Sequence, residues 1–264
     1  MLSLENHSNH FHVIIPAAGR GSRLGFELPK ILYPIAGKTI LERLLEAIQP
    51  WAARVTLVLN PAGVGPVQRE LNSIESYPPL QIAIQSSPVG MVDAILKAEP
   101  YVTIGEDIMI LWGDQVLISQ MTISNMVKKY FEFSPAAPRL VFPTLELESP
   151  YVHYVRDSNL RIINCLMRRD GDPMPQRGET DCGVFLLKSG LLKSFLPKFN
   201  EIEMKAHGNQ REVSFPRFIP FLSLNAIPVA TSVVEDPIES IGLNDENDLH
   251  TIEERINRWP LDLR

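Results

Sequence analysis

The residues with the clearest potential for chemistry form a turn of small side chains behind an apolar run near the start of the chain. The small residues of this turn are Ala17, Ala18, Gly19 and Gly21. Such a turn lets backbone N–H groups approach a phosphate chain and surround its anionic oxygens. Arg23 and Lys30 follow and add two positive charges to the same segment. The pattern therefore predicts a phosphate-binding loop.

Two commoner phosphate motifs fit this segment poorly. A dinucleotide fingerprint needs a third glycine where Leu24 stands, and it opens directly into a helix that Pro29 would interrupt. A Walker loop needs a glycine at position 32, which is Leu32, ahead of the Gly-Lys-Thr triplet at 37–39. The triplet is instead expected to begin a helix.

The elements that would position this loop alternate between strands and helices. Apolar runs of strand length cover 11–18, 55–59, 80–85 and 107–112, and helical patterns cover 39–49, 90–98 and 118–131. This alternation predicts an α/β, Rossmann-like fold with a mixed, mostly parallel sheet and helices on both faces. Ligands of such folds bind at the carboxyl ends of the strands.

The pattern becomes rich in strands from residue 138 onward. Expected strands cover 140–145, 151–156, 161–166, 183–188 and 226–234, with a proline-interrupted stretch at 211–222 and a closing helix at 245–258. We find no internal repeat and no linker. The interpretation is one domain over 1–264, with a nucleotide-binding half at about 11–135 and an acceptor-binding half at about 136–264.

Composition excludes several classes of partner. The chain has 264 residues, 45% hydrophobic and 21% charged, with a formal net charge of -6. No positive field attracts nucleic acid or an anionic membrane. Cys165 and Cys182 have no metal-knuckle or disulfide spacing, so reduced thiols are expected. With no secretory start and no apolar run of membrane length, a cytoplasmic protein without a membrane partner is expected.

Residues 12–48, HVIIPAAGRGSRLGFELPKILYPIAGKTILERLLEAI, resemble the signature of sugar-phosphate nucleotidyltransferases. The resemblance is closest to the uridyltransferase domain of bacterial N-acetylglucosamine 1-phosphate uridyltransferases, and it implies their GT-A-like nucleotide-diphospho-sugar transferase fold. It implies that Arg23 holds the leaving pyrophosphate and that Lys30 holds the reacting phosphates. The residues that it places along the triphosphate are Gly19, Arg20, Gly21 and Ser22, next to Ala17 and Ala18.

The segment 82–94, IAIQSSPVGMVDA, stands where this family reads the nucleobase. Gln85 offers an amide donor and an acceptor to a base edge, and Gly90 allows a close backbone approach. The similar uridyltransferases continue with Thr-Gly-His-Ala, whereas this chain has Met-Val-Asp-Ala at 91–94. The identity of the base therefore stays open, and so does the choice between a contact role for Asp93 and a place in an exposed first helical turn.

The metal site is predicted from two segments. Asp114 follows Gly113 at the end of an apolar strand, as in the family's Gly-Asp strand end, and a carboxylate there suits Mg²⁺. Residues 240–256 resemble the family's segment that carries a metal-binding asparagine, which corresponds to Asn244. A local alternative is that Asn244 or Asp245 caps the following helix.

The acceptor side departs from the resemblance. Val152 replaces a glycine, and Met167 replaces a glutamate that holds sugar hydroxyls in the uridyltransferases. Arg168 adds a donor for a phosphate or carboxylate, unless Met167 is core and Arg168 solvated. The expected acceptor contacts are Arg168, Glu179, Asp181 and Gly183. We hypothesise an acceptor other than N-acetylglucosamine 1-phosphate.

The sequence thus predicts a Mg²⁺-dependent nucleotidyltransferase that condenses a nucleoside triphosphate, UTP by resemblance, with a sugar 1-phosphate and releases pyrophosphate. Cytidylyl or other nucleotidyl transfer to a different phosphorylated metabolite stays open, as does a non-catalytic regulatory homologue. A homo-oligomer is also left open. The related uridyltransferases often carry an acetyltransferase coil of hexapeptide repeats, and no such repeat occurs in this sequence, so acetyl transfer is not expected.

Overall fold

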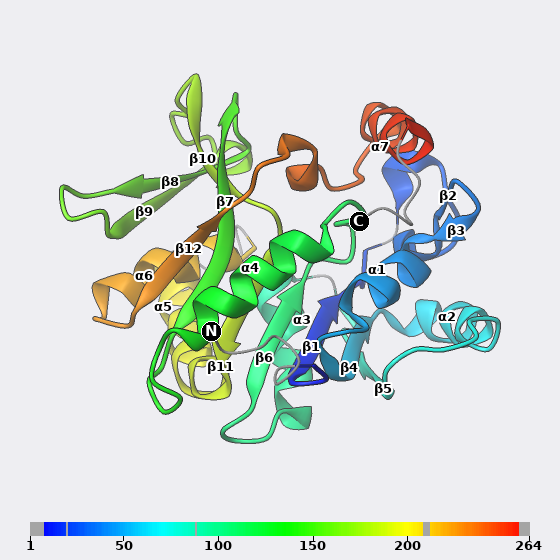
Figure 1. Ribbon diagram of the computed structural model, residues 1–264, viewed down its shortest axis with the longest axis horizontal. Helices are drawn as coiled ribbons and strands as arrows, with labels where there is room; N and C mark the ends of the chain where they lie inside the picture. The colour runs from blue at the N-terminus through cyan, green and yellow to red at the C-terminus, as the bar shows by residue number, and fades with distance from the viewer. Residues whose placement is uncertain (1–7, 20, 88, 208–211, 259–264) are drawn as a thin grey trace.

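The computed structural model describes residues 8–19, 21–87, 89–207 and 212–258. Within these ranges, eight strands form one sheet in the order β10-β7-β11-β6-β1-β4-β5, and β12 also pairs with β7 (Figure 1). The strands of this sheet are β1 (Phe11–Pro16), β4 (Ala52–Leu59), β5 (Leu80–Ile84), β6 (Asp107–Leu111), β7 (Leu140–Glu148), β10 (Arg177–Asp181), β11 (Val184–Lys188) and β12 (Val229–Val233). Two small ribbons pair β2 (Pro34–Ile35) with β3 (Lys38–Thr39), and β8 (Val152–Arg156) with β9 (Ile162–Met167).

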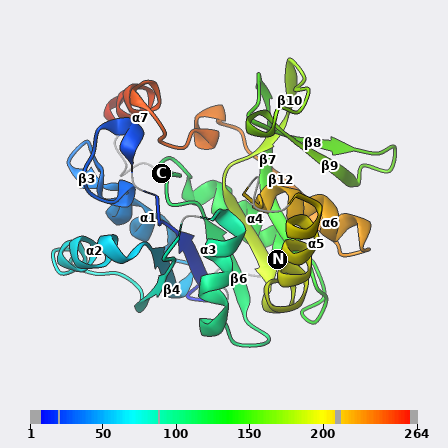
Figure 2. The same ribbon diagram turned by 180° about the vertical axis from the view of Figure 1, so that it is seen from behind.

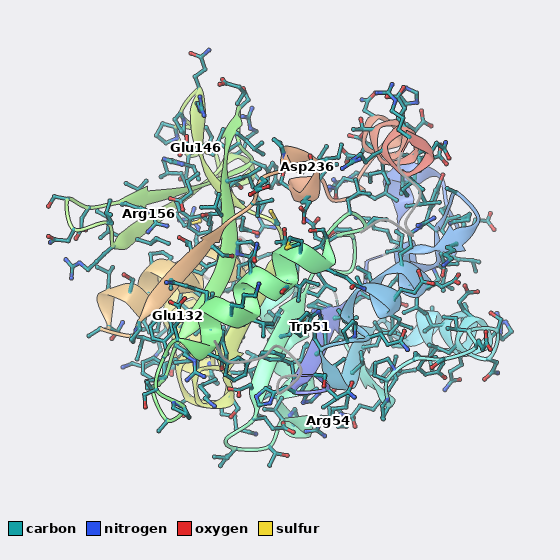
Figure 3. The ribbon with its side chains drawn as sticks, in the orientation of Figure 1. Trp51, Arg54, Glu132, Glu146, Arg156 and Asp236 are labelled. Carbon is teal, nitrogen blue, oxygen red and sulfur yellow. The ribbon has the colours of Figure 1, made fainter. Side chains whose placement is uncertain are left out.

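The first half of the chain builds the parallel part of the sheet. Strand β1 pairs in parallel with β4 and β6, and β4 pairs in parallel with β5. The second half adds β11 and β10 in antiparallel pairings and β12 in a parallel one. The β8–β9 hairpin, which carries Arg156, stands beside this second half (Figure 3). The predicted mixed, mostly parallel sheet is confirmed.

Helices cover both faces of the sheet (Figure 1, Figure 2). They are α1 (Ile40–Ile48), α2 (Val64–Leu71), α3 (Met91–Ala98), α4 (Gln120–Phe131), α5 (Leu196–His207), α6 (Phe218–Leu224) and α7 (Glu246–Arg258). Strand β1 shows the two layers by alternation: Val13 and Ile15 join the core of α1 and α4, whereas Ile14 joins the core of α3, α5 and α6. Burial on both faces explains its uninterrupted apolar sequence. In the described residues, no helix is long and apolar enough to span a bilayer.

A buried polar cluster closes the amino-terminal edge of the central strands, at the opposite end from the predicted phosphate loop. Asp107 begins β6, and its carboxylate accepts from the Tyr130 hydroxyl and pairs with Lys188 at 2.6 Å and His10 at 2.5 Å. Burial by itself would raise the pKa of Asp107. The hydrogen bonds from His10, Lys188 and Tyr130 outweigh burial and lower this pKa to about 2, from an ordinary value of 3.8.

Candidate functional site

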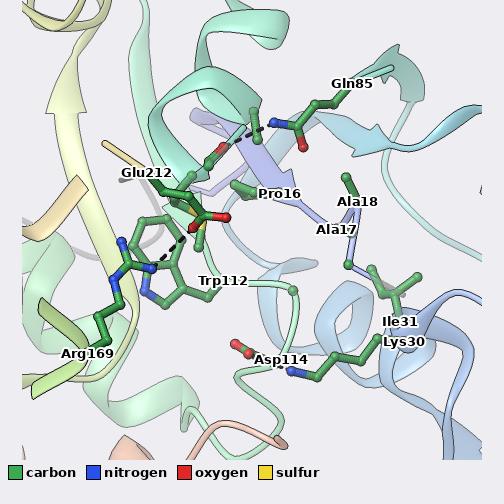
Figure 4. A pocket seen from close by; sticks show the side chains of 15 residues that line it. Pro16, Ala17, Ala18, Lys30, Ile31, Gln85, Trp112, Asp114, Arg169 and Glu212 are labelled. Carbon is green, nitrogen blue, oxygen red and sulfur yellow. Dashed lines mark hydrogen bonds and ion pairs between the residues drawn. The ribbon is translucent and has the colours of Figure 1, made fainter. Parts of the chain in front are cut away.

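A cleft opens at the carboxyl edge of the parallel strands (Figure 4). Its walls come from the end of β1, the predicted phosphate loop, the segment after β5, the start of α3 and the turn after β6. Residues selected from the sequence that line it are Ala17, Ala18, Gly19, Lys30, Gln85, Gly90 and Asp114. The fold therefore brings together the segments predicted to hold phosphate, base and metal.

Gly113 allows the turn after β6 to reach the end of β1. A Cβ atom at this position would lie 2.7 Å from the carbonyl oxygen of Pro16 and 3.2 Å from the Cβ of Ala17. Because real Cβ atoms do not approach backbone so closely, a larger residue would force the two turns apart. The glycine thus sets the distance between Asp114 and the phosphate loop.

Three predicted charged or polar residues meet at one point of the cleft. The Lys30 ammonium donates to a carboxylate oxygen of Asp114 at 2.9 Å and to the side-chain oxygen of Asn244 at 3.2 Å. The side chains of Lys30 and Asp114 are 18% and 27% exposed, so solvent still reaches the pair. The two oxygens predicted as metal ligands therefore face a common position that attracts positive charge.

Asn244 reaches this position because its neighbour caps the following helix. The Asp245 side chain accepts hydrogen bonds from the backbone N–H groups of Asn247 and Asp248, at 2.9 and 3.1 Å. Asp245 thereby satisfies the exposed donors at the start of α7. A backbone hydrogen bond from Leu243 to the Asp114 carbonyl, at 3.0 Å, holds the preceding loop against the turn after β6. The side chain of Asn244 is thus released from capping and turns toward Lys30.

The donor set at this point fits a hard divalent cation. Magnesium binds to proteins through one or two carboxylate or carbonyl oxygens, and substrate phosphates and water complete its octahedron. Asp114 supplies a carboxylate and Asn244 an amide oxygen, and both already contact the same cationic group. Among the described residues, no cluster of three or more His, Cys, Asp or Glu side chains offers an all-protein site.

The phosphate loop closes on itself around Lys30. The backbone N–H of Lys30 donates to the carbonyl of Gly19 at 3.3 Å, and that of Leu24 donates to the carbonyl of Gly21 at 2.9 Å. Arg23 is exposed and is not among the described residues that line the cleft. Arg20 and the side chain of Ser22 lie outside the described part of the chain. The triphosphate roles of these residues stay predictions.

Gln85 follows β5 and is buried in the cleft wall, with only 4% of its surface exposed. Its amide nitrogen donates to the Gly90 carbonyl at 3.0 Å and to the Asp93 carboxylate at 2.9 Å. Asp93 also pairs with Lys97 at 3.3 Å, one turn along α3. Asp93 therefore contacts the predicted base-reading side chain from within the first helical turn.

On the acceptor side, the structure agrees with the alternative in which Met167 is core and Arg168 is solvated. Met167 is buried in the core, and the Arg168 guanidinium donates to the carbonyls of Ser149 and Pro150. Arg168 is exposed and is not among the described residues of the cleft wall. Its neighbour Arg169 does line the cleft, where it pairs with Glu212 at 3.3 Å (Figure 4).

The other predicted acceptor residues make contacts to protein groups. Glu179 accepts two hydrogen bonds from the Arg156 guanidinium, at 2.6 and 2.7 Å. Asp181 accepts from the Tyr154 hydroxyl and from the Gly183 backbone, both at 2.8 Å, and its burial raises its pKa. Gly183 has a φ of +70°, and a Cβ atom there would lie 2.4 Å from the Trp112 ring. Of the residues in this paragraph, only Trp112 lines the cleft.

Comparison with known proteins identifies the family of this chain. Residues 13–167 match the profile of the MobA-like NTP transferase domain, a range that includes the predicted phosphate loop, the predicted base segment and the turn after β6. The chain belongs to this family. The bifunctional protein GlmU of Carboxydothermus hydrogenoformans is 31% identical over 248 residues, which are 93% of this chain and 52% of that protein. The chain thus spans about half the length of such curated relatives.

Solved structures share the fold of this MobA-like chain at low sequence identity. A candidate glucose-1-phosphate thymidylyltransferase from Bacillus anthracis superposes with a TM-score of 0.70 at 16% identity, covering 95% of this chain and 97% of that one. The inositol-1-phosphate CTP transferase from T. maritima gives 0.65 at 15% identity, covering 96% and 97%. The nucleotidyltransferase fold is therefore established.

Sequence reasoning missed part of the cleft of this NTP transferase domain. The lining residues that it did not select as site residues include Met91, Ala94, Trp112, Arg169 and Glu212. Trp112 directly precedes the Gly113–Asp114 pair, so its place beside the cleft could have been inferred from the strand end. Glu212 offered no local signal, because its position depends on how the segment before α6 packs against the start of α3.

Proposed function

We propose that this chain transfers a nucleotidyl group from a nucleoside triphosphate, UTP, to the phosphate of a sugar 1-phosphate and releases pyrophosphate. The observation that carries the proposal is the meeting of Lys30, Asp114 and Asn244 beside the small-residue turn at the carboxyl edge of the sheet. Membership of an NTP transferase family supports the reaction class. The choice of UTP rests on the GlmU relatives.

The chain's own groups suit an in-line displacement. An oxygen of the acceptor phosphate attacks the α-phosphorus and forms a new P–O bond while the bond to the β-phosphate oxygen breaks and pyrophosphate leaves. Negative charge is carried by the oxygens around the α-phosphorus and by the leaving group, so fixed cations and N–H donors accelerate the step. Lys30 and the backbone of the turn at 17–21 would supply these groups. No covalent intermediate with the protein is required.

Asp114 and Asn244 would hold a magnesium ion, which when bound would neutralise charge on the phosphate oxygens. Gln85 and the backbone at Gly90 would meet the nucleobase, since both line the cleft on the side of α3. These contacts do not choose between uracil and another base. Transfer from CTP is the alternative, because the T. maritima relative of the same fold is a CTP transferase.

The acceptor is proposed to lie between Trp112 and the Arg169–Glu212 pair. Arg169 would attract an anionic group by its charge, while its terminal nitrogens contact Glu212 and Ser214. Glu212 can accept hydrogen bonds from hydroxyls. Because Met167 belongs to the core, it offers no acceptor for sugar hydroxyls. This arrangement supports the hypothesis that the preferred acceptor differs from N-acetylglucosamine 1-phosphate.

The test is pyrophosphate release with each of the four nucleoside triphosphates, a panel of sugar 1-phosphates and other phosphorylated acceptors, and Mg²⁺. We expect release that needs an acceptor and stops when EDTA removes the metal. Absence of release with every combination, together with no triphosphate binding by calorimetry, would overturn the proposal and favour a non-catalytic role. A clear preference for N-acetylglucosamine 1-phosphate would overturn only the acceptor hypothesis.

A further inference from the structure

We infer that Asp93 sets the nucleobase preference by fixing the orientation of the Gln85 side-chain amide. In this orientation both amide hydrogens are used within the protein, and only the carbonyl oxygen of Gln85 remains for the base. Asp93 would be a positioning residue, since it acts through Gln85. The inference rests on the nucleotidyl transfer proposed above and adds a cause for the choice of base.

The two contacts of the amide nitrogen define its orientation. A primary amide has two N–H donors on one side and one acceptor oxygen on the other. One donor of Gln85 meets the Gly90 carbonyl at 3.0 Å and the other meets the Asp93 carboxylate at 2.9 Å. Figure 4 shows the Gln85 oxygen turned toward the side of the cleft that carries Ala18.

Rotating the amide by half a turn is unfavourable at this position. The Gln85 oxygen would then face a carbonyl oxygen and a carboxylate oxygen, so two hydrogen bonds would be replaced by repulsion between acceptors. Gln85 is almost fully buried, and water cannot compensate for these losses. The nitrogen and oxygen of this amide can therefore be assigned from the network.

The carboxylate of Asp93 adds a second constraint on the amide, beside the Gly90 carbonyl. An ionised carboxylate only accepts hydrogen bonds, whereas an amide at the same place could accept through its oxygen or donate through its nitrogen. The other contact of this carboxylate is an ion pair with Lys97 at 3.3 Å.

A fixed acceptor can distinguish the two pyrimidines from each other, and the two purines from each other. Within each of these pairs, the hydrogen-bond donor and acceptor positions are exchanged. Uracil has a donor at N3 and an acceptor at position 4, whereas cytosine has an acceptor at N3 and a donor at position 4. Guanine and adenine are opposed in the same way at N1 and position 6. Whichever of these atoms Gln85 meets, its oxygen favours one member of each pair. Freeing the amide to rotate should therefore reduce the preference within a pair.

The competing explanation is that Asp93 only stabilises α3. It is the third residue of that helix, where a negative charge interacts favourably with the helix dipole. Glu42 is the third residue of α1, also an acid in a first turn, and is not among the residues that line the cleft. The Glu42→Gln variant is thus a matched control for loss of a first-turn charge without any contact to Gln85.

The experiment compares kcat/KM for UTP and CTP, and for GTP and ATP, in the wild type, Asp93→Asn and Glu42→Gln. In the pair that contains the preferred triphosphate, we expect Asp93→Asn to bring the ratio of the two kcat/KM values roughly ten-fold closer to one. A change of this size corresponds to the loss of about one hydrogen bond to a charged group. Glu42→Gln should leave that ratio within about two-fold of the wild type. Thermal unfolding of all variants shows whether each is folded at the assay temperature.

A second background tests whether Asp93 acts through Gln85. With Gln85→Ala already present, adding Asp93→Asn should not move the ratio further, because no amide is left to rotate. A ratio unchanged by Asp93→Asn in the wild-type background, or changed equally with and without Gln85, would overturn the inference. If the wild type itself releases no pyrophosphate with any triphosphate, the proposed function fails instead.

Discussion

Replacing Lys30 by methionine should show whether the Lys30 ammonium acts in catalysis or only stabilises the fold. The change keeps most of the side-chain volume and removes the charge that contacts Asp114 and Asn244. The Lys30–Asp114 pair is 18% and 27% exposed, and ion pairs open to solvent contribute about 1 kcal/mol or less to stability. Losing a fixed cation that stabilises developing charge costs about 10² to 10³ in rate. We therefore expect a large loss of kcat with a small change in the free energy of unfolding.

A matched control is available in the Lys193–Glu99 pair. Its atoms lie 2.6 Å apart, its side chains are 22% and 32% exposed, and neither residue is among those described in the cleft wall. Lys193→Met should change the free energy of unfolding about as much as Lys30→Met and leave kcat within about two-fold of the wild type. The two pairs thus differ in location while their exposure is similar.

The assays are initial rates of pyrophosphate release at saturating triphosphate and acceptor, and urea unfolding followed by circular dichroism. The reasoning would be refuted if Lys30→Met kept more than a tenth of the wild-type kcat. It would also be refuted if Lys30→Met destabilised the protein by several kcal/mol more than Lys193→Met, since the lost activity would then reflect lost folding.

Three further predictions concern the acceptor wall, the packing of the cleft and acid stability. Arg169→Met should raise the KM for the phosphorylated acceptor about ten-fold or more, whereas Arg168→Met should change it less than two-fold, in steady-state kinetics with the acceptor varied. Gly183→Ala should destabilise the protein by about 1–3 kcal/mol, because the added methyl group collides with the Trp112 ring at a positive φ, and tryptophan fluorescence should report the displacement. The depressed pKa of Asp107 should contribute about 2 kcal/mol of stability above pH 4, and this contribution should be lost as the pH falls from about 4 to about 2. Urea titrations should show a shallower loss for Asp107→Asn across that window, and an equal loss in both proteins would contradict the pKa.

The parts of the fold that sequence patterns predicted are those with strong periodicity. The expected strand at 55–59 lies within β4 (Ala52–Leu59), and the expected helix at 39–49 contains α1 (Ile40–Ile48). The first is a short apolar run, which is typical of a buried strand, and the second has apolar residues at helical spacing. Helix α2 was missed because Val64–Leu71 contains a glycine and a proline in its first turn. Helix α5 was missed because Leu196–His207 contains a proline and several charged residues, and its apolar stripe is weak.

Site residues were predictable where local chemistry and position along a strand coincide. The place of Asp114 in the cleft could be predicted because the parallel strand β6 ends three residues before it, and ligands of such folds bind at the edge where these strands end. Arg169 could not, because the sequence offers two adjacent arginines and only the turn after β9 decides which one lines the cleft. The contact of Glu179 with Arg156 could not be predicted either, because it requires the β8–β9 hairpin to pack beside β10.

The site depends most on contacts between segments far apart in the sequence. Lys30 contacts a residue 84 positions later and another 214 positions later, so no local motif contains the three groups. Asn244 reaches Lys30 only because the Leu243–Asp114 backbone bond fixes the loop and because α7 buries Ile252 and Ile256 in the core. A perturbation of α7 far from the cleft should therefore weaken the proposed metal and phosphate binding before it unfolds the sheet. The order of these two losses follows from packing, since α7 is held by few buried side chains and the central strands by many.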